Sequence, residues 1–154
     1  MRFVALASVF LLLLQPALVS QKAASMHHAT GTFEVKIKPE SLSETAAPAA
    51  LSRMSLDKIF HGQLEATSKG EMLSVLDKEK GSGGYVAIER VTGTLDGHAG
   101  SFVLQHTGTM NRGAPQLIVT VIPDSGTGEL TGITGSMQID IAEGKHSYTF
   151  DYSL

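Results

Sequence analysis

A histidine lies in line with apolar residues in the run GSFVLQHTGTM, residues 100–110. The run alternates as a β-strand does, and strand geometry places His106 on the same face as Phe102 and Leu104. An imidazole in such a water-poor setting can give or take a proton near neutral pH. We therefore interpret His106 as a candidate catalytic acid/base group.

A carboxylate lies in the preceding run YVAIERV, where Glu89 and Arg90 fall on opposite faces. The turn signal DGHAG, residues 96–100, predicts that the two runs form a β-hairpin. If the turn closes symmetrically about 97–98, Glu89 lies directly opposite His106, with the two Cβ atoms about 5 Å apart. A register shifted by one residue places Arg90 opposite His106 instead. In the first register, Glu89 and His106 form a candidate catalytic pair.

Short alternating runs that would position these groups extend along the chain, and no segment keeps a helical period. The predicted strands cover residues 33–38, 53–60, 63–67, 71–76, 85–95, 100–110, 116–122, 137–141 and 146–154. Residues 63–67 and 71–76 are interpreted as one strand that is interrupted or turned at 69–70. The continuous apolar run at 116–122 predicts burial on both faces. About eight antiparallel strands predict an all-β sandwich or closed barrel, whose interior holds one small ligand or is filled by side chains.

The first twenty residues, MRFVALASVFLLLLQPALVS, combine Arg2 with an apolar run shorter than the about 20 residues of a membrane span. This pattern predicts a signal peptide at 1–20, no stable membrane span, and a secreted or periplasmic protein; an uncleaved anchor is the alternative. A flexible lead-in at 21–30 and a single β-barrel domain at 31–154 follow. Removing Arg2 leaves 11 of the 12 Lys and Arg residues against 15 Asp and Glu, a net charge of about −4. Such a chain, without basic clusters, predicts no nucleic-acid partner.

Other chemistries lack their motifs in this sequence. The absence of Cys rules out disulfides, thiol catalysis and zinc–thiolate sites, and no GxSxG motif of a serine hydrolase is present. Of six histidines only His27 and His28 are adjacent, so we predict neither a metal site nor a cofactor. The segment PDSGTGELTGITGSMQI, residues 123–139, completes neither GxGxxG nor GK[ST] and is interpreted as tight turns leading into a strand.

Four stretches of the chain resemble a known family. GTFEVKI, GGYVAIERVTGTLDGHAGSFVLQHTGTM, SGTGELTGITGSMQI and HSYTFDYSL are similar to the domain-of-unknown-function family 3224, over roughly residues 29–154. The pattern GTGxLxGxxGxxxI is also similar to the glycine-rich segment of allene oxide cyclases and, distantly, of dirigent proteins. The resemblance implies a small antiparallel, allene oxide cyclase-like barrel, often a homo-oligomer, without an assigned activity. It also makes Glu89 and His106 parts of one motif, which favours the register that pairs them.

Three interpretations of function remain open. In the first, the barrel binds a small apolar molecule and isomerises or cyclises it by acid/base chemistry at Glu89 and His106, as the cyclase-like resemblance suggests. In the second, the two residues are a structural polar pair. In the third, the barrel binds a ligand without catalysis, as the dirigent resemblance suggests. The predicted ligand-binding residues are Tyr85, Phe102, Leu104, Gln105 and Tyr148, although Gln105 falls on the opposite face from His106.

Overall fold

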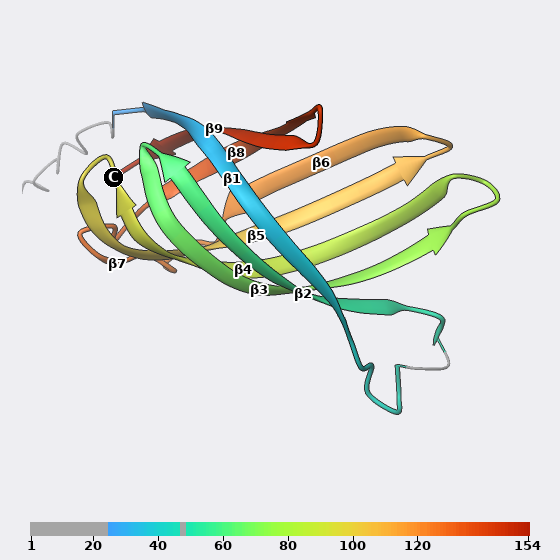
Figure 1. The fold of residues 1–154 in the computed structure, drawn as a ribbon. Coiled ribbons are helices and arrows are strands. Elements are labelled where there is room, and N and C mark those ends of the chain that lie inside the picture. Colours follow the sequence, from blue (N-terminus) through green and yellow to red (C-terminus); the bar gives the residue numbers. More distant parts are fainter. Residues whose placement is uncertain (1–24, 47–48) are drawn as a thin grey trace, which may run out of the picture.

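Eight strands close into one antiparallel barrel in the computed structural model, which describes residues 25–46 and 49–154 (Figure 1). The strands are β1 (His27–Glu40), β2 (Ser52–Gly62), β3 (Leu64–Asp77), β4 (Ser82–Leu95), β5 (His98–Asn111), β6 (Ala114–Val121), β8 (Thr134–Ala142) and β9 (Lys145–Ser153), and a short β7 (Thr127–Gly128) pairs with β5. Their order around the barrel is β4-β3-β2-β1-β9-β8-β6-β5, and pairing of β4 with β5 closes the ring. The predicted all-β barrel of about eight strands is confirmed.

The two ends of the barrel differ. At one end, here called the capped end, lie the β2–β3 and β4–β5 turns and the segment 122–133, which places Leu130 and Ile133 in the core at 1% exposure each. At the other, here called the open end, the β3–β4 and β5–β6 hairpins extend outward (Figure 1). The first and last strands are neighbours, because His27 of β1 pairs with Tyr152 of β9.

Alternation along the strands fills the interior with apolar side chains. The largest fully buried ones toward the capped end are aromatic: Phe150 stacks between Phe102 and Tyr152, with ring centroids 5.6 and 5.4 Å away. The hydroxyl of Tyr152 donates to Asp96 Oδ2 at 2.6 Å, so the stack is tied to the β4–β5 turn. This end of the barrel is therefore a packed core rather than a channel.

The barrel has one weakly paired seam. β6 and β8 share a single bridge, Thr120 with Ser136. By contrast, β3 and β4 pair continuously from Leu64 with Leu95 to Asp77 with Ser82. Closure between β6 and β8 thus depends on few backbone hydrogen bonds.

Two strands differ from their sequence-based expectations. β3 is continuous through Gly70, because that glycine serves a close approach rather than a turn: a Cβ there would lie 2.6 Å from the Cβ of Glu89. The prediction that residues 116–122 are buried on both faces is wrong, since Leu117 and Ile118 are 40% and 54% exposed. Ile118 is exposed because it lies on the outer face of the barrel, opposite in parity to the buried Val119 and Val121. Leu117 shares the inward face but lies toward the open end, beyond the one bridge to β8, where it lines a cavity instead of the core.

The N-terminal boundary is also earlier than expected. β1 begins at His27, so residues 27–30 pair with β9 instead of forming a flexible lead-in. The predicted signal peptide at 1–20 and residues 21–24 lie outside the described residues. Within the described part of the chain, no helix has the length and apolar character needed to cross a membrane.

Candidate functional site

Four polar side chains form a buried network inside the barrel. Glu89, 1% exposed, is at its centre: its Oε1 accepts a hydrogen bond from Lys58 Nζ at 2.6 Å and lies 2.8 Å from His106 Nε2. Its other oxygen, Oε2, accepts a hydrogen bond from the hydroxyl of Ser68 at 2.7 Å. All four residues are at most 5% exposed, so both carboxylate oxygens are satisfied by protein rather than by water.

Four adjacent strands supply one residue each to this network. Lys58 of β2 pairs directly with Ser68 of β3, while Glu89 of β4 and His106 of β5 are displaced along their strands toward the open end. Strands in a closed barrel tilt relative to its axis, so a layer of inward side chains crosses them diagonally. The network is such a layer, and it lies above the apolar core.

The predicted register of the β4–β5 hairpin is wrong by two residues. Glu89 pairs with Leu104, and His106 pairs with Ala87. The reason is the turn, which consists of Asp96 and Gly97, both at positive φ (48° and 85°). An even shift keeps every side chain on its predicted face, so Glu89 and His106 still meet across a diagonal.

The charges of the network stabilise one another. Burial raises the pKa of Glu89, but the hydrogen bond from His106 and the charge of Lys58 outweigh it and lower the pKa to about 2. Glu89 is therefore ionised at neutral pH and acts as a hydrogen-bond acceptor. The Lys58 ammonium also lies 5.0 and 5.7 Å from the ring centroids of Phe33 and Phe60, a favourable cation–π arrangement.

The ionised carboxylate orients the imidazole of His106. Because Glu89 Oε1 accepts, we assign the proton to Nε2, which leaves the lone pair of a neutral ring on Nδ1. Nδ1 has no hydrogen-bond partner among the described residues, yet no fully enclosed side-chain nitrogen or oxygen in them lacks one. Nδ1 is therefore the ring nitrogen whose lone pair the described residues leave without a donor.

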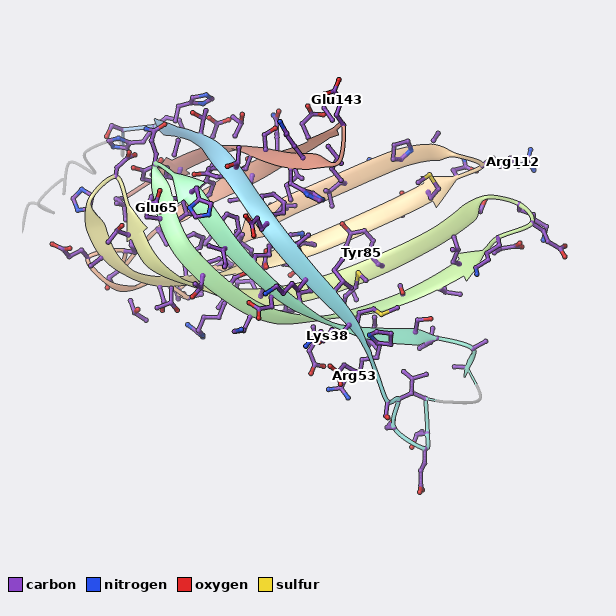
Figure 2. All side chains as sticks on the ribbon, in the orientation of Figure 1. Lys38, Arg53, Glu65, Tyr85, Arg112 and Glu143 are labelled. Atoms are coloured by element: carbon purple, nitrogen blue, oxygen red, sulfur yellow. The ribbon has the colours of Figure 1, made fainter. Side chains whose placement is uncertain are left out.

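A cavity of about 350 Å³ lies at the open end. Its lining residues are Met72, Ser74, Val75, Leu76, Gly83, Gly84, Tyr85, Gly108, Thr109, Met110, Pro115, Gln116 and Leu117. Tyr85 links this cavity to the network, because it projects from β4 toward the barrel interior (Figure 2). It lies on the same face of the strand as Ala87 and Glu89, two and four residues before them. Glu89, Lys58 and His106 do not line the cavity themselves, so the half-buried Tyr85 stands between them and the open end.

The ring of Tyr85 packs on Gly108. A Cβ at position 108 would lie 2.0 Å from Tyr85 Cε1, so only glycine leaves room for the ring in this position. Burial and the negative charge of Glu89 both raise the pKa of Tyr85, which keeps the phenol neutral. The neutral phenol keeps its O–H group as a hydrogen-bond donor.

Comparisons with known proteins place the chain in a family. The family described as "Protein of unknown function (DUF3224)" matches residues 29–152. The chain belongs to the DUF3224 family. A crystal structure of a DUF3224 protein of unknown function from Shewanella oneidensis MR-1 is similar to it, with 50% sequence identity, a TM-score of 0.77, and coverage of 84% of this chain and 98% of that one. No curated protein matches the chain.

Sequence reasoning missed two members of the network in this DUF3224 barrel, Lys58 and Ser68. The signal was present, because Lys58 falls on the same strand face as Leu56 and Phe60, as His106 does among its own apolar neighbours. Lysine was passed over because it is almost never fully buried without a partner. The partner, Glu89, lies 31 residues away and two strands along the sheet.

The remaining predicted ligand-binding residues of the DUF3224 barrel lie in three different settings. Phe102 and Leu104 have no exposed surface and belong to the apolar core below the network. Tyr148 is also buried; its hydroxyl accepts from the Leu64 backbone N–H at 2.9 Å, which anchors β9 to β3. Gln105 is exposed on the outer face, as its parity predicted. Contact of these four with a ligand stays a prediction.

The other sequence features of the DUF3224 chain take structural positions. His28 contacts Asp151 at 2.7 Å on the surface, and within the described residues no group of three or more His, Asp or Glu side chains is arranged to hold a metal ion. The glycine-rich segment forms turns and the short β7 before entering β8, as predicted.

Proposed function

We propose that this DUF3224 barrel binds a small, mainly apolar molecule at its open end and isomerises or cyclises it by proton transfer through His106. The observation that carries the proposal is the buried carboxylate of Glu89, which holds Nε2 of the imidazole and leaves Nδ1 without a partner among the described residues. A carboxylate–imidazole pair of this kind serves as a general base and then a general acid. The adjoining cavity of about 350 Å³ falls in the range of small-molecule pockets.

In this mechanism each residue has one task. His106 Nδ1 takes a proton from the bound molecule, and the resulting imidazolium is stabilised by its contact with Glu89. The same nitrogen returns the proton to a different atom of the molecule, so that the enzyme ends unchanged. Tyr85 must turn or share the space, because it separates the cavity from His106.

The first experiment identifies the ligand and then tests the pair. Small molecules that remain bound after native purification are identified by mass spectrometry, and the variants Glu89→Gln and His106→Ala are compared with wild type for binding and conversion. Thr107→Ala is the matched control, because that side chain is exposed on the outer face of the same strand as His106. Loss of conversion in both network variants, with the control unaffected, supports the proposal. Folded variants that bind and convert the ligand as wild type does would reject it.

A second candidate is a barrel that binds a ligand without chemistry, or in which the network is only structural. It is favoured by the position of Tyr85 over the network and by the complete hydrogen bonding of fully enclosed side-chain atoms in the described part of the chain. The two candidates differ in one measurement: a binding barrel returns the identified ligand chemically unchanged, whereas an enzyme converts it.

We also propose that the protein is exported and released after removal of residues 1–20. The support is Arg2 followed by an apolar run that is shorter than a membrane span. Mass spectrometry of the exported protein is expected to show an N-terminus near Gln21. A mature protein that begins at Met1 would contradict this.

A further inference from the structure

We infer that the molecule bound here is a weak acid with an apolar body, such as a ketone with an acidic C–H bond, which is held as its oxyanion by Lys58 after its proton moves to His106. This inference rests on the proposed function for the access of a ligand, and it adds the chemical class of that ligand. It assigns a role to Lys58, a network member that the acid/base pair alone does not require.

Lys58 has hydrogen-bonding capacity beyond its contact with Glu89. An ammonium group carries three N–H donors, and Glu89 Oε1 is the one acceptor that Lys58 meets among the described residues. The rest of the group lies against the rings of Phe33 and Phe60 at 5.0 and 5.7 Å, which stabilise a cation but take up no hydrogen bond of ordinary strength. A developing oxyanion is the partner that such a donor binds most strongly in a site shielded from water.

Lys58 and His106 are held side by side by the same atom. Both contact Glu89 Oε1, at 2.6 and 2.8 Å. The ammonium group of Lys58 and the imidazole ring of His106 are therefore neighbours in one buried layer, and Nδ1 is the ring nitrogen that does not contact Oε1. Proton removal beside a carbonyl group needs this combination, because the base takes the proton while the donor stabilises the charge that appears on oxygen.

Charge balance selects a weak acid over a permanent anion. With His106 neutral, the positive charge of Lys58 and the negative charge of Glu89 cancel. An anion that brings no proton, such as a sulfonate, would leave one uncompensated negative charge in the interior while His106 is neutral, which is costly. A weak acid brings its own proton: the proton moves to His106 Nδ1, the C–H or O–H bonding pair remains on the ligand as an oxyanion, and the sum of charges stays at zero.

The cavity fits the apolar part of such a ligand. Met72, Leu76, Met110 and Leu117 line it, with no acidic or basic side chain among its lining residues. The polar end of the ligand would then point past Tyr85 toward the network. Ligand chemistry is thus divided along the barrel axis, apolar at the open end and acidic at the inner end.

The test uses 4-nitrophenol, a planar weak acid whose anion resembles an enolate and absorbs at longer wavelength than the neutral form. Wild-type protein is added to 4-nitrophenol at a pH at which the free compound is mostly protonated. We expect the band of the phenolate to grow with protein concentration. 4-Nitroanisole, which has the same shape but no acidic proton, is expected to bind at least about tenfold more weakly, the ratio that corresponds to about 1.4 kcal/mol.

Variants connect the spectroscopic change to the network. Lys58→Met and His106→Gln are expected to abolish the phenolate band, whereas Lys58→Arg, which keeps a charged donor, retains part of it. Lys69→Met is the matched control, since Lys69 makes its ion pair with Asp57 on the exposed outer surface. Circular dichroism and thermal unfolding establish that each variant is folded. If Lys58→Met is not folded, the reduced phenolate band expected of Lys58→Arg tests the role of this side chain.

Each result decides between the proposals. If 4-nitrophenol binds only in its neutral form, or if 4-nitroanisole binds equally well, the cavity takes ligands but this inference is overturned. If neither compound binds, and the apolar dye Nile red does not bind either, the proposed ligand site fails together with the inference. A phenolate band that is unaffected by Lys58→Arg, Lys58→Met and His106→Gln would place the anion elsewhere and overturn the inference as well.

Discussion

The charged form of the Glu89 carboxylate depends on the side chains that surround it. A carboxylate with 1% exposure would bind a proton more readily if it were alone, because burial disfavours its charged form. His106 and Lys58 reverse that preference, and Ser68 adds a third hydrogen bond, so that the carboxylate is held from three different strands. Removing any single member of the network is therefore expected to lower the stability of the fold. Replacing all of its members together by apolar side chains need not lower it.

Replacing Lys58 by Met is expected to lower the free energy of unfolding by about 3–5 kcal/mol, because it leaves the Glu89 carboxylate with an uncompensated charge in the interior. Urea denaturation followed by circular dichroism measures this. Lys69→Met removes an exposed ion pair and is expected to cost a small fraction of that amount. Equal losses in the two variants would mean that the buried pair has no special contribution.

Acid is expected to destabilise the barrel through Glu89. Its pKa is 4.5 in an unperturbed chain and about 2 in the folded protein, so the unfolded state binds the proton more readily. The stabilisation is complete above pH 4.5 and is lost as the pH falls through about 2. In Glu89→Gln, the free energy of unfolding should decline less steeply over this interval than in wild type. Identical slopes would show that other carboxylates account for acid unfolding.

At the level of strands, parity was predictable and register was not. Alternation in the sequence assigned Glu89 and His106 to inward faces, and the structure confirms both. The register depends on the geometry of the Asp96–Gly97 turn, which the longer turn signal DGHAG did not specify. The misinterpreted Gly70 and the missed Lys58 share one cause: each is explained by Glu89 on another strand, and a single strand's pattern contains no information about its neighbours.

The fit between β4 and β5 at Tyr85 and Gly108 can be tested by adding one methyl group. Gly108→Ala is expected to displace the ring of Tyr85 and lower the free energy of unfolding by about 1–3 kcal/mol, as overpacking does. Gly84→Ala is the control, since a Cβ there meets its nearest atom at an ordinary 3.5 Å. In the double variant Tyr85→Ala/Gly108→Ala the clash is gone. Additive losses in that double-mutant cycle would contradict the packing described here.

At the level of the whole molecule, the barrel combines a filled half and an accessible half. The capped end is a continuous apolar core with stacked aromatic rings, and the open end contains the cavity. The number of strands and the all-β class followed from the sequence, because turn signals and alternation are local. The sequence did not predict which half is filled, since that depends on how the segment 122–133 folds over one end.

The seam between β6 and β8 is expected to be the least protected part of the ring. Amide hydrogen exchange followed by mass spectrometry should show faster exchange for residues 115–118 of β6 and the facing residues 138–141 of β8 than for the continuous β3–β4 pair. The physical reason is the single bridge that joins β6 and β8. Uniform protection around the barrel would contradict this expectation.

The pairing of β1 with β9 has a consequence for protein engineering. Because His27 lies beside Tyr152, the first and last strands could be joined, and the chain could start at another strand, without a change in which strands are neighbours. A short linker between residues 25 and 154 would join the ring at the capped end, and new ends could be opened at the exposed turn of Glu143 and Gly144. Such a circular permutant would begin with β9, continue through the linker into β1, and end with β8. Every residue of the network would keep its present contacts.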